Sequence, residues 1–179
     1  MFSVNEKVVY PGHGVAIVSQ AIEKSVAGHK VCFFELTFLS KDMTILVPVK
    51  SLTGIRRLSS VKKIDDVFNM LSQPTTKDIH ELTASNWNKR NKDYQFRLRS
   101  GSLDEIGHVY RDLKFIATQK ELSFGEKNLL HQTESLLAQE IAIVKQINED
   151  KAIELLRSFF TMHKNNVIMH SKQTVATVI

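Results

Sequence analysis

The chain has 179 residues, of which 42% are hydrophobic and 24% charged, and its formal net charge is +5. These proportions are those of a globular protein with one large or two small domains, and seven glycines and three prolines are too few for long disordered linkers. No apolar run approaches the roughly 20 residues of a membrane-spanning helix, and the N-terminus lacks the apolar core of a signal peptide. The single cysteine, Cys32, excludes an internal disulfide, so we expect a cytoplasmic protein with no membrane contact.

The first 58 residues predict a small β domain. Strands are expected at residues 4–10, 15–21, 30–39 and 43–49, with 55–58 as a fifth candidate. Pro48 has no N–H, so its strand should lie at a sheet edge or end there. Cys32 lies in the apolar run 31–34, where we expect a buried, unreactive thiol. Strands this short and closely spaced predict a small curled barrel.

Beyond Ser60 the apolar period changes from two to about 3.6, which predicts helices. A first helix should end before Pro74, followed by a polar connection over residues 75–85. A second helix should begin near Trp87 and end at Gly101, which is well placed as its C-terminal cap. The whole chain is therefore predicted to be an α+β protein, with a β domain at 1–58 and a helical bundle at 59–160.

Two Ser-x-x-Glu sequences, starting at Ser102 and Ser123, predict capping boxes for two further helices. The helix that starts at Ser123 should be the longest, and residues 150–160 either continue it or form a last short helix. Residues 161–179 show no helical period, and no role is assigned to them.

The second predicted helix is strongly basic and holds the only tryptophan, Trp87. It contains one acidic residue, Asp93, and five basic residues, an excess of four positive charges. The basic residues are Lys89, Arg90, Lys92, Arg97 and Arg99. Clustered cations are suited to phosphates, and a large apolar ring beside them can wedge against a base step. Trp87 lies in the first turn, where no preceding turn covers it. Its spacing to Tyr94 and Leu98 also fits one amphipathic stripe, so burial in the core stays an alternative.

Seven stretches carry a more specific signal. In the first domain they are Val8-Val9-Tyr10-Pro11-Gly12-His13-Gly14, Asp42-Met43-Thr44-Ile45-Leu46-Val47-Pro48-Val49 and Gly54-Ile55-Arg56. In the second they are Trp87-Asn88-Lys89-Arg90, Leu98-Arg99-Ser100-Gly101, Val109-Tyr110-Arg111-Asp112-Leu113 and Leu122-Ser123-Phe124-Gly125-Glu126-Lys127. In order and spacing, over about residues 1–158, these stretches resemble the CarD family of bacterial transcription regulators.

The resemblance implies a Tudor-like N-terminal barrel that docks on the β subunit of bacterial RNA polymerase, and a helical domain that touches promoter DNA. It implies that Trp87 wedges into the minor groove at the upstream edge of the melted DNA. The cations that would contact the DNA backbone nearby are Lys89, Arg90, Lys92 and Lys127. The residues that would contact polymerase are Lys24, Thr44, Ile45, Leu46, Val47 and Pro48, although Leu46 stands where some relatives carry arginine.

The expected function is therefore a transcription regulator that stabilises the open promoter complex with little sequence specificity. We expect a monomer associated with the nucleoid, without cofactor or metal. An alternative is a polymerase-bound protein adaptor in which Trp87 is buried and the helices do not touch DNA.

The sequence gives less support to two other classes of function. A Tudor-like domain can cage methylated side chains between aromatic rings, but strand alternation assigns most of the available rings to the core; these are Tyr10, Phe33, Phe34 and Phe38. An enzyme is not expected, because the seven histidines are scattered without metal-site spacing and no P-loop sequence is present.

Overall fold

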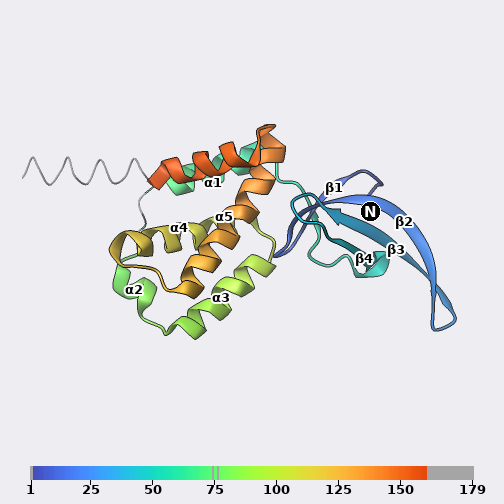
Figure 1. Cartoon of the computed structure of the whole chain (residues 1–179), viewed down its shortest axis with the longest axis horizontal. Coiled ribbons are helices and arrows are strands. Elements are labelled where there is room, and N and C mark those ends of the chain that lie inside the picture. Colours follow the sequence, from blue (N-terminus) through green and yellow to red (C-terminus); the bar gives the residue numbers. More distant parts are fainter. Residues whose placement is uncertain (1, 74, 76, 161–179) are drawn as a thin grey trace, which may run out of the picture.

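The computed structural model describes residues 2–73, 75 and 77–160, and it shows an antiparallel sheet followed by helices (Figure 1). The strands in these residues are β1 (Lys7–Tyr10), β2 (Gly14–Val26), β3 (His29–Phe38), β4 (Thr44–Pro48) and β5 (Arg56–Arg57), with a 3-10 turn at Val49–Ser51. The helices are α1 (Val61–Ser72), α2 (Ile79–Thr83), α3 (Trp87–Arg99), α4 (Leu103–Gln119) and α5 (Phe124–Lys145), and residues 149–160 are also helical. The α+β prediction is confirmed, and the predicted tail at 161–179 lies outside the described residues.

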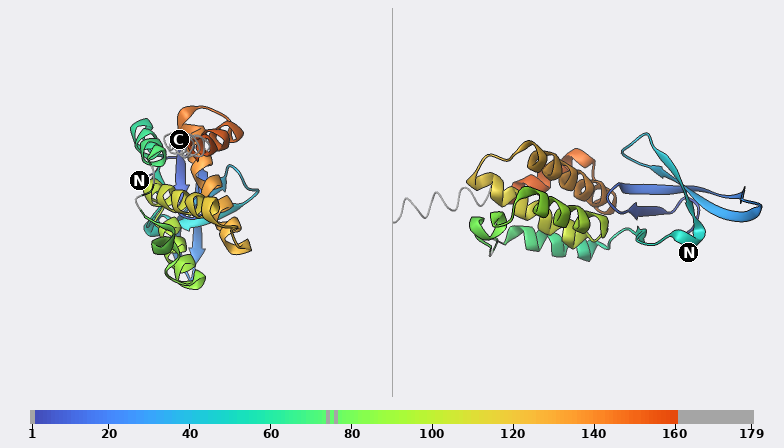
Figure 2. Two further views of the ribbon diagram at one scale, coloured as in Figure 1. Left: turned by 90° about the vertical axis from the view of Figure 1, so that its left-hand side faces the viewer. Right: turned by 90° about the horizontal axis from the view of Figure 1, so that it is seen from below.

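The strands form one sheet in the order β4-β3-β2-β1-β5, with every neighbouring pair antiparallel. Alternate side chains fill its inner face and make a small apolar cluster of Val8, Ala16, Val18, Phe34, Leu36, Phe38 and Val47. Pro48 lies in β4, at one edge of the sheet, as its missing N–H predicted. The sheet and the helices lie end to end along the molecule (Figures 1 and 2).

Strands β2 and β3 extend beyond the rest of the sheet as a two-stranded arm (Figure 1). β2 runs to Val26 instead of ending at residue 21, and the arm closes at Ala27 and Gly28, whose φ angles of 49° and 83° suit a two-residue hairpin turn. The sequence did not reveal the arm because its residues are mostly exposed, so no apolar alternation marks them. Cys32 lies on this arm and is exposed, so the predicted burial of its thiol was wrong.

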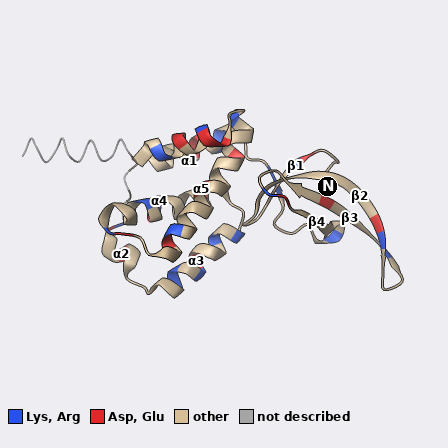
Figure 3. Cartoon of the chain, viewed as in Figure 1, with Lys and Arg blue, Asp and Glu red and all other residues tan. Residues whose placement is uncertain are grey.

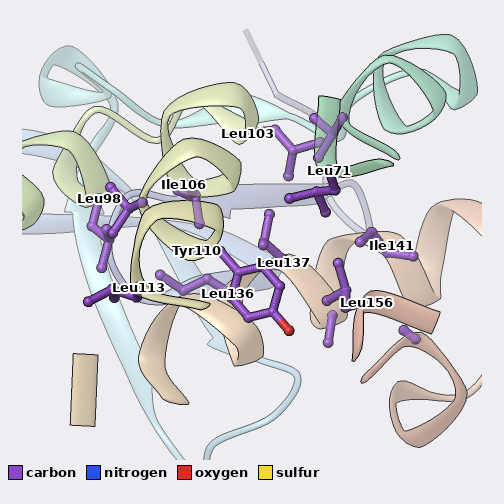
Figure 4. Packing of buried hydrophobic residues seen from close by; sticks show 14 of the residues in the cluster. Leu71, Leu98, Leu103, Ile106, Tyr110, Leu113, Leu136, Leu137, Ile141 and Leu156 are labelled. Carbon is purple, nitrogen blue, oxygen red and sulfur yellow. The ribbon is translucent and has the colours of Figure 1, made fainter. Parts of the chain in front are cut away.

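The helical domain packs around α4 and α5, whose apolar faces meet in the centre of the bundle (Figure 4). Leu113, Leu137 and Ile141 are fully buried there, and Leu156 from the helical segment 149–160 joins them. Tyr110 is buried as well, and its hydroxyl donates a hydrogen bond of 2.8 Å to Glu134. This cluster is separate from the cluster in the sheet, so each domain has its own core.

The ends of the helices agree with the sequence patterns only in part. Ser123 and Glu126 form the predicted capping box of α5, whereas the side chain of Ser102 makes no capping hydrogen bond, so that box was wrong. Gln146 has a φ of 56° and ends α5, so residues 149–160 are a separate helix. The short helix α2 was missed within the predicted polar connection, because Leu82 is its only buried residue and Asp78 its only cap.

Glu134 should make stability depend on pH. Burial opposes its ionisation, but hydrogen bonds from Arg157 and Tyr110 outweigh burial and hold the pKa of the Glu134 carboxyl below its ordinary value. Its stabilising contribution is therefore complete above the unfolded pKa of about 4.3 and is lost as the pH falls through the lower folded pKa. We expect Glu134→Gln to show a shallower loss of unfolding free energy on acidification than the wild type, measured by urea denaturation at a series of pH values. Equal slopes would contradict this assignment.

Candidate nucleic-acid and protein interfaces

Trp87 is the first residue of α3, where the sequence placed it. Asn86 caps the helix, and its side-chain oxygen accepts a hydrogen bond of 3.0 Å from the backbone N–H of Lys89. Trp87 is partly buried and packs against the core of the helical domain. Trp87 is thus neither fully buried in the core nor fully exposed to solvent.

Gly125 provides the surface on which the indole rests. A Cβ at this position would lie 2.9 Å from both Cζ2 and Nε1 of Trp87, closer than real side chains approach. The guanidinium of Arg90 also lies near the ring, with its central carbon 5.7 Å from the ring centroid, which is a cation–π contact. The indole is thus positioned by groups from both α3 and α5.

Arg90 is mainly an internal partner in this structure. Its side chain is only 11% exposed, and one guanidinium nitrogen lies 2.5 Å from Glu126 while another donates 3.0 Å to the carbonyl of Ser85. Burial opposes ionisation of Glu126, but hydrogen bonds from Ser123 outweigh burial and keep its pKa below the ordinary value. Arg90 and Glu126 therefore tie the start of α3 to the start of α5.

The other predicted DNA contacts lie on the surface. Lys89 and Lys92 are exposed, and Arg99 continues the same face of α3 at helical spacing. Several positions along the ribbon of α3 carry Lys or Arg (blue in Figure 3). Lys127 lies in the first turn of α5, where its ammonium group is 2.8 Å from Glu121 and its side chain is 54% exposed. Gly125 lies against the Trp87 ring and Glu126 pairs with Arg90, so the beginning of α5 lies beside Trp87.

Two exposed phenylalanines belong to these same helices, and sequence reasoning missed both. Phe124 begins α5 and is 81% exposed, and Phe96 lies on the basic face of α3 and is 75% exposed. The available signals were the position of Phe124 directly after a cap, and the spacing of Phe96 from Lys89, Lys92 and Arg99.

The predicted polymerase strand β4 is an edge strand, and within the described residues only β3 pairs with it. The backbone N–H of Phe38 donates to the carbonyl of Met43, and the polar groups of a strand alternate in direction. The backbones of Thr44 and Leu46 therefore point away from β3, toward the open edge. Their side chains are also exposed, with Leu46 at 38%.

The remaining predicted polymerase residues divide into two groups. Val47 is buried in the sheet core, and Ile45 and Pro48 are half-buried. Lys24 is exposed on the arm, opposite Val31, just beyond the point where Phe33 pairs with Pro48. The structure thus places Lys24 in the arm and not in the β4 edge itself.

Neither a metal group nor a membrane span is found in the part of the chain that the structure describes. No three His, Cys, Asp or Glu side chains gather there in a way that could hold a metal ion. None of the helices described is long and apolar enough to cross a membrane.

The chain thus joins a Tudor-like sheet, with an open edge at β4, to helices in which exposed cations lie near Trp87, and its two candidate surfaces belong to different domains. Comparison with known families agrees with this division: residues 2–59 match the model described as "CarD-like/TRCF RID domain", and residues 66–157 match "CarD, C-terminal domain". The chain belongs to the CarD family of transcription regulators and has an RNA polymerase-interacting role. These families are not enzyme families.

A curated relative supports the same assignment. The chain is 23% identical over 151 residues to the "Putative transcription factor YdeB" of Bacillus subtilis (strain 168), and the match covers 83% of this chain and 95% of the relative. The similarity thus extends across both domains.

Gly125→Ala tests whether the indole rests on the α5 backbone. In an open helix this change would stabilise by about 0.5–1 kcal/mol, but here the added methyl must displace Trp87, so we expect a loss of about 1–3 kcal/mol. Urea denaturation measures the loss, and the emission of the single tryptophan reports the displacement. Asn128→Ala, at an exposed site on the same helix, is the matched control: it should stabilise by no more than about 0.7 kcal/mol, the propensity gain of alanine, and leave the emission unchanged. A stabilised Gly125→Ala variant would show that the ring is not held there.

Proposed function

We propose that this protein binds the β subunit of bacterial RNA polymerase through the edge of β4 and stabilises the open promoter complex by wedging Trp87 into the minor groove. The proposed contact lies at the upstream edge of the melted DNA. The observation that carries the proposal is the partly buried Trp87 at the start of the basic helix α3, with its indole held by Gly125 and Arg90.

The fixed position of the Trp87 indole suits insertion between base pairs. Unstacking a base step costs a few kcal/mol, and this cost is offset only if the inserted side chain keeps its position and the distorted DNA gains contacts. An indole supported by Gly125 and Arg90 loses little conformational freedom on insertion. Once in place, it hinders closing of the upstream edge, so the open complex lasts longer.

The exposed cations around Trp87 supply the contacts with the DNA backbone. Lys89, Lys92 and Lys127 are free to reach phosphates from the surface, although Lys127 must exchange its pairing with the exposed Glu121. A contact between Arg90 and the DNA backbone stays a prediction. To make it, Arg90 would have to give up hydrogen bonds that its guanidinium now makes to Glu126 and to the carbonyl of Ser85. So few phosphate contacts give weak, salt-sensitive binding with little sequence specificity.

Polymerase binding would compensate for that weak affinity. The outward N–H and C=O groups of Thr44 and Leu46 can pair with an extended strand of the partner, and Lys24 on the arm can add an electrostatic contact. Anchoring raises the local concentration of Trp87 at the promoter, so recruitment by polymerase replaces recognition of an operator and associates the protein with the nucleoid.

A second candidate is a polymerase-bound adaptor whose helices contact another protein. The exposed rings of Phe96 and Phe124 favour it, because large exposed apolar side chains often mark protein interfaces. The basic surface of α3 favours DNA instead, so the wedge is the primary proposal.

Trp87→Ala should abolish most of the effect on the open complex. Removal of a wedge worth a few kcal/mol should shorten the open-complex lifetime about tenfold or more relative to wild-type protein. The lifetime is followed with purified polymerase and a fluorophore at the upstream edge of the melted DNA. Thr118→Ala, an exposed change near the end of α4, serves as control. If Trp87→Ala prolongs the open state as the wild type does, the adaptor is the better account.

Leu46→Pro tests pairing at the edge of β4. Proline removes the outward N–H of residue 46 and leaves the inward pairing of Ile45 and Val47 with β3 intact. We expect this variant to bind polymerase more weakly than Leu46→Ala by about 0.5–1.5 kcal/mol, the net contribution of one hydrogen bond. Binding is measured by titration of labelled protein with polymerase. Equal affinities of the two variants, both folded by circular dichroism, would rule out main-chain pairing at this position.

A further inference from the structure

The two domains are joined by a buried ion pair that belongs to neither core. Arg56 of β5 donates two hydrogen bonds, of 2.7 and 2.8 Å, to the two carboxylate oxygens of Glu140 in α5. Its Nε donates a third, of 2.6 Å, to the carbonyl of Gly101 in the turn between α3 and α4. Glu140 is only 2% exposed and Arg56 27% exposed, so water competes little for these contacts.

Backbone groups of the first domain and the linker complete the contact. The backbone N–H of Ser59 donates 2.7 Å to Glu140, and the backbone N–H of Val15 donates 3.3 Å to Gln139, the preceding residue of α5. Gly14 approaches Gln139 so closely that a Cβ at residue 14 would overlap its side chain. We refer to Arg56, Ser59, Gln139 and Glu140 as the interdomain contact.

The interdomain contact is poorly explained by stability alone. Each domain has its own apolar cluster, and a buried ion pair commonly contributes little more than well-packed apolar side chains would. A forked arginine with several fixed acceptors supplies a defined geometry, and Arg56 also donates to the carbonyl of Arg57 and to the hydroxyl of Ser59. Relative motion of two domains is the default expectation unless their interface is large and apolar, and these hydrogen bonds oppose such motion.

The sheet order shows what that fixed geometry connects. β4 and β5 are the two edges of the sheet, so Arg56 binds the helical domain from the edge opposite the proposed polymerase surface. The sheet then acts as a spacer of constant width between polymerase and α3. Glu140 lies on the same helix as Glu126, which holds Arg90 beside Trp87.

From this arrangement we infer that Arg56 and Glu140 are positioning residues that fix where along the promoter Trp87 acts. The inference rests on the proposed polymerase and DNA contacts, and it adds the ion pair that fixes the distance between these two contacts. With the pair intact, the distance from the polymerase surface to Trp87 is constant and the wedge meets a single base step. With the pair broken, the tethered helical domain samples several positions, and its effective concentration at the correct step falls.

Photo-crosslinking in the open complex tests the inference. A benzoylphenylalanine replaces Phe96, which is exposed on the basic face of α3, in the full-length chain. The crosslinked promoter nucleotides are then mapped in three backgrounds, namely wild type, Glu140→Gln and Glu134→Gln. Glu134 is the matched control, because it is a buried carboxylate of α5 paired with Arg157 inside the helical domain.

The expected result is a narrow set of adjacent nucleotides for wild type and for Glu134→Gln, and a wider set for Glu140→Gln. The open-complex lifetime with Glu140→Gln should also fall by about threefold or more, while polymerase affinity is retained, because only the effective concentration of the wedge changes. Arg56→Lys, which keeps the charge and loses the fork, should widen the crosslinks as well, and it serves if Glu140→Gln does not fold.

Two outcomes would overturn the inference in different ways. Identical crosslinks in the wild-type, Glu140→Gln and Arg56→Lys proteins would show that the pair does not position α3, and the proposed function would stand. Absence of promoter crosslinks even in the wild-type background would remove the proposed DNA contact and the positioning role with it.

Discussion

Helix α5 organises this molecule through three buried glutamates, each bound by an arginine from another part of the chain. Glu126 binds Arg90 of α3, Glu134 binds Arg157 of the helical segment 149–160, and Glu140 binds Arg56 of β5. A buried carboxylate without its partner costs several kcal/mol, so each of these elements is strongly constrained to stay on α5. The apolar cores fill the two domains, but these pairs decide how the surface elements are oriented.

The candidate functional surfaces depend directly on two of these pairs. Arg90 reaches Glu126 and in doing so lies beside the indole of Trp87, while Gly125 of the same helical turn gives the ring its surface. Arg56 reaches Glu140 and so relates the sheet, with its open β4 edge, to α3. The proposed function, with polymerase bound by one domain and DNA by the other, depends on both constraints: one on the position of the Trp87 ring and one between the domains.

Much of the fold could be predicted from the sequence, because the signals were local. The strands at the start of the chain, the beginning of α3 at Trp87 and the capping box of Ser123 and Glu126 all follow from spacing within a few residues. The arm of β2 and β3 and the short helix α2 were not recognised, because few of their residues are buried. The burial of Cys32 was predicted wrongly for the same reason: its apolar neighbours suggested a buried strand, but this part of the arm is exposed.

The ion pairs between arginines and glutamates could not be predicted from residue spacing in the sequence. The family resemblance assigned Arg90 to DNA together with Lys89, Lys92 and Lys127, and nothing in the sequence indicated that Glu126, 36 positions away, is its partner. Arg56 and Glu140 are 84 positions apart, and only the fold shows that they meet. Sequence patterns thus located the basic helix correctly but could not separate its surface cations from the cation that supports Trp87.

The most direct test of this account is an electron cryomicroscopy structure of the protein bound to RNA polymerase at an open promoter. The account predicts β4 paired with a strand of the β subunit and the indole of Trp87 in the minor groove at the upstream edge of the melted DNA. It also predicts that Arg56 and Glu140 remain paired in the complex. A helical domain turned away from the DNA, with Trp87 covered by protein, would contradict the central claim.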